Sequence, residues 1–148
     1  MSDIAILGNV GSFDLALAGA DLQTDAGLDT AVILSLFCDA RADADEIPDG
    51  ADPRGYWGDA FAEDAGDRFG SKLWLLAREK QLQSVADRAQ EYAQAALAWL
   101  VADGIAASVV VVASFPERGA IQIAVAIARP GAGAAFERQY QYVWSAYQ

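Results

Sequence analysis

The pattern of apolar and polar positions predicts paired strands at the start of the chain. Residues 12–19, SFDLALAG, alternate, so that Phe13, Leu15 and Leu17 fall on one side, and Gly19 ends the strand. Residues 20–27, ADLQTDAG, then form a turn or a second short strand. Residues 1–11 contain little to hold them, so we expect them to be unordered in the isolated chain.

A buried helix is predicted over residues 28–41, LDTAVILSLFCDAR. Its apolar residues recur at helical spacing, and Ile33 and Phe37 widen the apolar face. Thr24 or Asp25 is expected to cap its start. The β-branched content leaves a strand as the alternative.

The clearest periodic segment is 84–104, SVADRAQEYAQAALAWLVADG, which predicts a long helix. Ser84 and Asp87 have the spacing of a capping box, and Gly104 stands where a helix ends. One apolar stripe is expected to face the core: Val85, Ala89, Tyr92, Ala96, Trp99 and Leu100. Residues 71–82 before it predict a shorter helix.

Three β-rich runs follow the long helix. Residues 105–115 and 120–128 flank the sequence PERG and predict an antiparallel hairpin with Ile121, Ile123, Val125 and Ile127 on its buried face. Residues 129–135 predict a loop, and 136–147 a last strand with Tyr140, Tyr142 and Trp144 on one side. Because the strands cluster at the end, the order favours an α+β fold: a C-terminal antiparallel sheet packed on one long and one shorter buried helix.

Length and charge restrict the partners. A chain of 148 residues predicts one domain over 1–148. The net charge of −11 repels nucleic acid and anionic membranes and suits a basic protein surface. The first residues do not resemble a signal peptide, and no apolar run approaches the roughly 20 residues that span a bilayer.

Composition also narrows the chemistry. Cys38 is the single cysteine, so it has no partner for an intramolecular disulfide, and it is interpreted as a small buried apolar residue. The chain has no histidine, and this removes the commonest general base and metal ligand. Together with the failure of the chemical interpretations of residues 43–74 tested below, this leads us to expect no catalytic residue, no metal and no cofactor.

The stretch 48–74, PDGADPRGYWGDAFAEDAGDRFGSKLW, carries the candidate chemistry. A calcium loop starting at Asp43 fails, because Ile47 and Pro48 occupy the positions of a ligand and of the required glycine. A glycosidase needs two placed carboxylates, and Glu63, Glu79 and Glu117 are candidates only as glutamates near turns or helix ends. GDRFGSK lacks the spacing of a phosphate loop.

The remaining features of this stretch are aromatic and ionic. Tyr56, Trp57 and Trp74 could bind a sugar, but we favour the interpretation that they anchor the loop to the core. Arg54 and Arg68 are expected to pair with nearby carboxylates. The candidates for these pairs are Asp52, Asp59 and Asp67.

Taken in order, several runs resemble the Mu-like phage baseplate family, small wedge proteins similar to the sheath initiators of contractile tails. The runs are LQTDAGLDTAVILSLFCDARA, PDG, RGYWGD, GDRFGSKLWLLAREK and RAQEYAQAALAWLVADGIA. Together they span about residues 12–130. RGYWGD followed by GDRFGSKLWLL and the long helix is the most specific part.

The resemblance implies a non-enzymatic structural role in the virion tail, after synthesis in the host cytoplasm. Such proteins lie at the inner baseplate beside the central hub and spike, in sixfold arrangement. Their partners are larger wedge proteins, and the first sheath ring builds on strands of the wider family. One departure is that residues 102–105, ADGI, stand where wider relatives carry a Glu-Pro-Arg loop, so that interface is not carried over.

On this interpretation, the stretch orders a hairpin region and an interface. Its signature residues are Arg54, Gly55, Tyr56, Trp57, Asp59, Asp67, Arg68 and Trp74. For each arginine, a surface salt bridge worth under about 1 kcal/mol is the competing interpretation. The alternative functions are a carboxylate-dependent, lysozyme-like peptidoglycan hydrolase and a carbohydrate-binding module.

Overall fold

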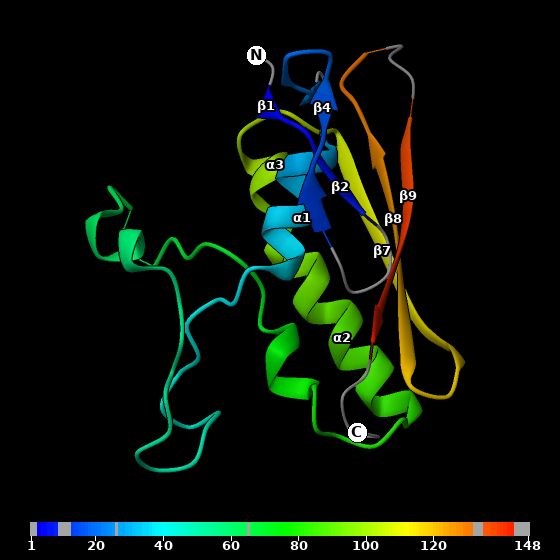
Figure 1. The fold of residues 1–148 in the computed structure, drawn as a ribbon. Helices are drawn as coiled ribbons and strands as arrows, with labels where there is room; N and C mark the ends of the chain where they lie inside the picture. Colours follow the sequence, from blue (N-terminus) through cyan, green and yellow to red (C-terminus); the bar gives the residue numbers. More distant parts are fainter. Residues whose placement is uncertain (1–2, 9–12, 26, 65, 132–134, 144–148) are drawn as a thin grey trace.

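The computed structural model describes residues 3–8, 13–25, 27–64, 66–131 and 135–143. Its fold is α+β, as predicted. A sheet of β7 (Ser108–Glu117), β8 (Ala120–Ala128) and β9 (Phe136–Val143) packs against the helices α1 (Asp29–Phe37), α2 (Gln83–Ala96) and α3 (Trp99–Ala102). Figure 1 shows the sheet as one layer, with α1 and α2 covering one of its faces.

The three strands form an antiparallel sheet in the order β7-β8-β9. Val111 pairs with Val125 across the predicted hairpin, and Ile123 pairs with Tyr140 of β9. A register shift lies between Ser114 and Glu117. The predicted hairpin and last strand are therefore confirmed as far as Val143, and the prediction for Trp144 lies outside the described residues.

Strict alternation places one face of the sheet in the core. In β7 and β8 the buried residues are odd-numbered, and the exposed Val110 and Val112 lie on the opposite face. The buried side chains that meet between sheet and helices include Val32, Leu36, Leu97, Leu100, Val125 and Ile127. Phe37 of α1 contacts both Phe13 and Tyr140, at ring-centroid distances of 5.0 and 5.7 Å. These contacts join the N-terminal segment to β9.

The two edges of the sheet differ. Along β7, Gln94 of α2 donates from Nε2 to the carbonyl of Val109 (2.7 Å) and accepts at Oε1 from the N–H of Val111 (3.1 Å). Gln90 accepts from the N–H of Ala113 at 3.3 Å. Side chains of α2 thus satisfy three outward backbone groups of β7: the carbonyl of Val109 and the N–H groups of Val111 and Ala113. Within the described residues, no strand pairs with the outer edge of β9.

Six short strands precede α1, where the sequence predicts one or two. They pair as β1 (Asp3–Ile4) with β6 (Thr24–Asp25), β2 (Ile6–Gly8) with β3 (Phe13–Leu15), and β4 (Leu17–Ala18) with β5 (Asp21–Leu22). Thr30 of α1 holds this segment, because its Oγ1 donates to the carbonyl of Ile4 (3.0 Å) and accepts from the N–H of Ile6 (3.2 Å).

The helices begin and end differently from the prediction. α1 ends at Phe37 rather than at residue 41, because Cys38 is extended (φ −81°, ψ 145°) and its carbonyl accepts from the N–H of Ser71. Asp25, one of the two predicted caps, accepts from the N–H groups of Gly27 (2.6 Å) and Thr30 (3.0 Å). The cap predicted at Ser84 is wrong, since α2 begins after Leu82 without a side-chain cap.

The long helix is confirmed in its main part but is interrupted at Leu97 and Ala98, and Trp99–Ala102 forms α3. The buried stripe includes Val85, Ala89 and Leu100, as predicted, whereas Trp99 is exposed. Gly104 follows α3 with a φ of +72°, as expected for the end of a helix. The predicted short helix over 71–82 is the 3₁₀ helix η2 (Leu73–Leu76).

Candidate interaction surface

Residues 41–70 form a long projection from the body, which we call the arm. Figure 1 shows it extending away from the helices between α1 and η2. It is closed at its base by a parallel bridge between Asp39 and Ser71. There, the N–H of Ala40 donates to the carbonyl of Ser71, and the N–H of Ser71 donates to that of Cys38, both at 2.9 Å.

The chain around Gly70 and Ser71 is held tightly at this base. Ser71 is buried, and its Oγ donates to the last-turn carbonyl of Leu36 at 2.5 Å. Gly70 has a φ of +96°, and a Cβ placed on it would lie 2.5 Å from the carbonyl oxygen of Cys38. Only glycine fits here without a shift of the backbone.

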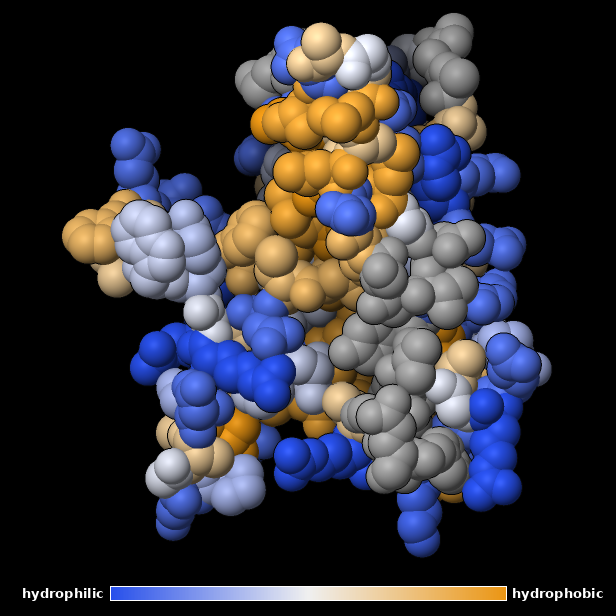
Figure 2. Space-filling model, in the orientation of Figure 1, coloured by the Kyte–Doolittle hydropathy of each residue, from blue (hydrophilic) through white to orange (hydrophobic). Residues whose placement is uncertain are grey.

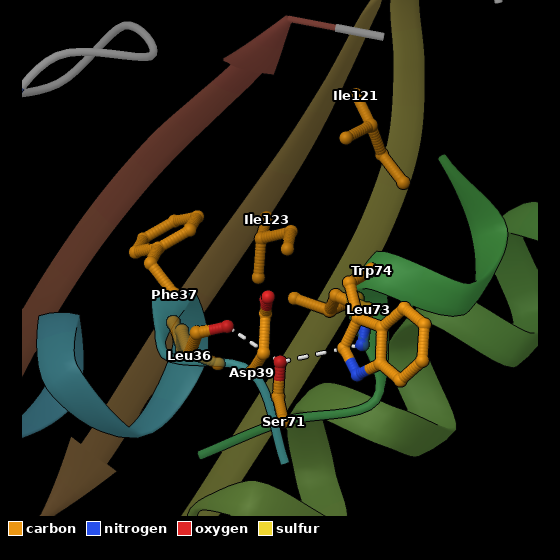
Figure 3. A pocket seen from close by; sticks show the side chains of 8 residues that line it. All are labelled: Leu36, Phe37, Asp39, Ser71, Leu73, Trp74, Ile121 and Ile123. Atoms are coloured by element: carbon orange, nitrogen blue, oxygen red, sulfur yellow. Dashed lines mark hydrogen bonds between the residues drawn. The ribbon is translucent and has the colours of Figure 1, made fainter. Parts of the chain in front are cut away.

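A small cavity of about 30 Å³ lies beneath the bridge (Figure 3). Its walls come from α1, the arm base, η2 and β8. Two hydrogen bonds of Ser71 lie at this cavity. The Ser71 Oγ donates to the carbonyl of Leu36 and accepts from the N–H of Leu73. The surrounding side chains are otherwise mostly apolar, including Ile121 and Ile123. The cavity is about the size of one water molecule, too small for a substrate.

Arg54 and Trp74 fix the arm to the body from two sides. The Nε1–H of Trp74 donates to the carbonyl of Ala40 at 2.8 Å, and the Arg54 guanidinium lies 4.4 Å from the centre of its ring. Arg54 forms its ion pair with Asp39, at 2.7 Å. Asp52, an expected partner, instead accepts from the Arg54 backbone N–H. Beside it, a Cβ on Gly55 would lie 2.7 Å from the Cβ of Arg41.

The acidic run is engaged in ion pairs at the arm base. Asp43 pairs with Arg68 and Lys72, both at 2.9 Å, and Glu46 pairs with Lys72 at 2.7 Å. The expected pairing of Arg68 with Asp59 or Asp67 is therefore wrong, and Arg68 also donates to the carbonyl of Arg41. In the described residues, no group of three or more His, Cys, Asp or Glu side chains is arranged to hold a metal ion.

These contacts shift the protonation equilibria in one direction. Hydrogen bonds from Lys72, and then Arg68, lower the pKa of Asp43, and the hydrogen bond from Lys72 lowers the pKa of Glu46. Partial burial opposes the charge of Lys72, but its bonds to Glu46 and Asp43 outweigh this and raise its pKa. The network is thus stabilised in its fully charged form.

The aromatic residues of the arm do not behave as predicted. Trp57 is 74% exposed, and Tyr56 contacts Trp57 and Phe69 at ring-centroid distances of 5.3 Å. Phe61, at the end of the 3₁₀ helix η1 (Trp57–Phe61), is 79% exposed. The anchoring expected of Trp57 and Tyr56 is therefore wrong: these side chains cluster at the arm, and only Trp74 anchors it.

Asp59 and Asp67 have more local roles. Asp59 accepts at Oδ1 from the N–H of Phe69 at 3.1 Å, which links the two sides of the arm. The N–H of Asp67 donates to the carbonyl of Asp64 at 3.1 Å. The stretch 48–74 therefore contributes some residues that attach the arm to the body and others that lie on the exposed surface of the arm. Asp39, Asp43, Ser71 and Lys72 complete the base, although no local sequence signal links them.

The groups considered for catalysis lie elsewhere or are engaged. Burial, and then Asp39, raises the pKa of the Cys38 thiol, which favours its neutral, unreactive form. Glu79 pairs with Arg88, while Glu63 lies on the arm and Glu117 ends β7. The lowered pKa values of Asp43 and Glu46 are the opposite of what a general acid needs. No described helix has the length and apolar content to cross a membrane.

Comparison with known sequences identifies the family. The sequence model of the family Phage protein GP46 matches residues 28–134, which include α1, the arm, α2 and the β7–β8 hairpin. The chain belongs to this family. The match begins at α1 and covers the whole arm and its base, so the contacts described above fall inside the family region.

Two relatives match across most of their length. The Mu-like prophage FluMu protein gp46 of Haemophilus influenzae is 40% identical over 145 residues, which cover 98% of this chain and 99% of the relative. The baseplate protein gp46 of Escherichia phage Mu is 41% identical over 132 residues, covering 88% and 89%. The resemblance to the Mu-like family is confirmed.

Proposed function

We propose that this GP46-family chain is a structural component of a contractile phage-tail baseplate and acts through protein–protein contacts rather than catalysis. The observation that carries the proposal is the similarity, over 88% of the chain, to a relative named as the baseplate protein of phage Mu. The arm adds support, because exposed aromatic residues on a projection that is bonded to the body at its base suit a protein interface better than a catalytic site.

The finer role that we propose is that of an inner wedge protein of the sheath-initiator type, located in the virion tail. It would be present in six copies, beside the central hub and spike, in contact with larger wedge proteins and the first sheath ring. The eight signature residues would serve this role in two groups. Arg54, Gly55, Arg68 and Trp74 hold the arm, and Tyr56, Trp57, Asp59 and Asp67 form or order its surface.

The proposed docking strand for the sheath partner is the outer edge of β9. Gln94 and Gln90 occupy the opposite edge, at β7, so it is closed to a new strand. Strand addition requires a row of unpaired backbone groups, and β9 is the strand of this sheet that lacks an outer neighbour among the described residues.

The register identifies the backbone groups that face outward. The backbone carbonyl of Val109 and the backbone N–H of Val111 bond to Gln94 of α2, so the backbone groups of residues 110 and 112 bond to β8. In an antiparallel sheet this alternation continues from strand to strand, so the register carries it to β9. The backbone N–H and C=O groups of Arg138 and Tyr140 then face β8. Those of Glu137, Gln139 and Gln141 face outward, away from the sheet. Gln139 lies in the middle of this row.

A proline at position 139 tests this edge. Gln139→Pro removes one outward N–H and leaves the β8 ladder intact, since proline is tolerated on edge strands. We expect the variant to fold but to enter tail particles at least about tenfold less than wild type, because a central ladder bond is lost. Gln139→Ala, which keeps the N–H, should assemble normally. Normal incorporation of a folded Gln139→Pro chain would contradict docking at β9.

A further inference from the structure

A groove runs between the arm and the body, with a volume of about 1190 Å³. Its body wall is largely apolar and comes from β1, β2, β3, α1, α3 and the last residue of α2. The side chains that form it include Ile4, Ile6, Leu15, Ala31, Leu34 and Trp99. Figure 2 shows apolar side chains gathered on this part of the molecule beside the arm. Small-molecule sites bury most of the ligand surface, whereas this groove is open to solvent and suits a polypeptide segment better.

The charge of the groove is one-sided. Five aspartates line it: Asp3, Asp59, Asp64, Asp67 and Asp103. Arg68 is the one basic residue of the lining, and it is engaged by Asp43 and by the carbonyl of Arg41. The aspartates of the lining therefore attract a positively charged occupant, because Arg68 is the one basic side chain of the lining beside them. The net charge of −11 over the whole chain adds to this attraction.

Asp59 adds a specific acceptor. Its Oδ1 accepts from the N–H of Phe69, but its Oδ2 is buried without a hydrogen-bond partner in the described part of the chain. An unsatisfied buried carboxylate oxygen is costly, and a bound segment that shifts the Asp59 side chain and donates to this oxygen would remove that cost. This atom belongs to a residue of the groove, on the arm side.

We propose that the groove binds a basic, amphipathic segment of another baseplate polypeptide. Aliphatic or aromatic side chains of the segment lie on the apolar body wall, and its lysines or arginines face the aspartates of the arm. This inference rests on the proposed function for the existence of the partner. It concerns a surface formed by the arm, α1 and α3, separate from the edge of β9.

Photo-crosslinking in assembled particles tests the proposal. The probe is p-benzoylphenylalanine, placed at Ala62 on the arm wall or at Ala102 of α3, both exposed groove residues. We expect both positions to crosslink to one segment of another polypeptide, in which Lys and Arg outnumber Asp and Glu and apolar residues recur. Ala51, an exposed alanine of the arm outside the groove lining, is the matched control and should not label that segment.

The contrary outcomes are distinct. Crosslinks to an acidic segment, to a second copy of this chain or to no polypeptide, in particles that contain the chain, would overturn the groove proposal alone. Labelling of the same segment from Ala51 would also overturn it. Absence of the chain from purified particles would overturn the proposed function itself, before any crosslink is measured.

Charge reversal provides a second measurement. Asp64→Lys with Asp67→Lys places positive charge on the arm wall of the groove, and we expect incorporation into particles to fall at least about tenfold. Asp45→Lys with Asp49→Lys makes the same charge change on the arm outside the groove lining and should incorporate normally. Equal incorporation of the two double variants, both checked for folding by circular dichroism, would overturn the proposal.

Discussion

The side chain of Gln94 occupies the edge of β7 at Val111, where its Oε1 accepts from the backbone N–H at 3.1 Å. Its Nε2 donates to the carbonyl of Val109, so one amide group satisfies two backbone groups that a neighbouring strand would otherwise pair. The helix thus covers the sheet face with its apolar residues and closes one sheet edge with its glutamines. Among the described residues, the outer edge of β9 is then the sheet edge without a pairing strand, and it is the edge proposed above for docking.

Removing this amide should destabilise the fold. Gln94→Ala leaves the backbone groups of Val109 and Val111 without their partner, and we expect the free energy of unfolding to fall by about 1–2 kcal/mol. Chemical denaturation measures it. Gln83→Ala removes an exposed bond to Asp87 and is the control for the change in helix propensity. Equal losses in the two variants would show that the β7 edge does not depend on Gln94.

Substitution of two arm glycines distinguishes the cost of backbone strain from the cost of a steric clash at the arm base. Gly66 and Gly70 have nearly the same φ, +98° and +96°, but a Cβ on Gly66 would meet no atom within 4 Å. Gly66→Ala should cost about 1 kcal/mol of unfolding free energy, through strain alone. Gly70→Ala should cost at least about 2 kcal/mol more, because its Cβ would meet the carbonyl of Cys38. Similar costs for both would contradict the tight packing described at the base.

The two groups of signature aromatics should respond differently to truncation. Trp74→Ala removes a hydrogen bond and the surface against which Arg54 packs, so we expect a loss of about 3 kcal/mol in unfolding free energy. Trp57→Ala should change it by less than about 0.5 kcal/mol, since the side chain is 74% exposed. Incorporation into particles should nevertheless fall for Trp57→Ala. Strong destabilisation by Trp57→Ala would restore the anchor interpretation.

Acid should weaken the arm base in a defined window. The pKa values of Asp43 and Glu46 are lowered in the folded chain, from ordinary values of 3.8 and 4.5. Their contribution to stability is therefore complete above about pH 4.5 and is lost as the pH falls through the folded values. Glu46→Gln should be less stable than wild type at pH 7, and the difference should shrink below pH 4.5. Denaturation curves from pH 3 to 7 measure it.

A control with an unpaired carboxylate makes this test specific. Asp45 is an exposed neighbour in the same acidic run, outside the ion pairs to Lys72. Asp45→Asn changes the net charge by the same amount as Glu46→Gln, and its stability difference from wild type at pH 7 should be the smaller of the two, because Asp45 is outside the ion pairs to Lys72. A Glu46→Gln difference that does not vary with pH would contradict the role of the Lys72 pairs.

Local signals in the sequence predict the regular elements well. The structure confirms the hairpin and the main part of the long helix. Each is predicted from a pattern of neighbouring residues: the alternation in 120–128, the periodicity of 84–96 and the glycine at position 104. The interruption at Leu97 and Ala98 has no glycine or proline to mark it. Leu97 is fully buried in the core, together with residues of α1 and the sheet. These contacts join residues distant in sequence, so the local periodicity does not show them.

The arm base could not be predicted because its partners are distant in sequence. Arg54 pairs with Asp39, and Lys72 with Asp43, across 15 and 29 residues, whereas the sequence pattern predicts pairs of the arginines with nearer carboxylates. The same limit applies to the aromatics: composition does not distinguish Trp74, which meets the body, from Trp57, which projects with the arm. The family resemblance, in contrast, depends on the order of short runs and was accessible from sequence alone.

The most direct test of the account is quantitative mass spectrometry of purified, intact tail particles from the source that encodes this chain. Its copy number should be set against that of a wedge protein known to be present in six copies. A matching ratio is the result that we predict for a structural baseplate component. Absence from intact particles, with the wedge protein present, would contradict the central claim.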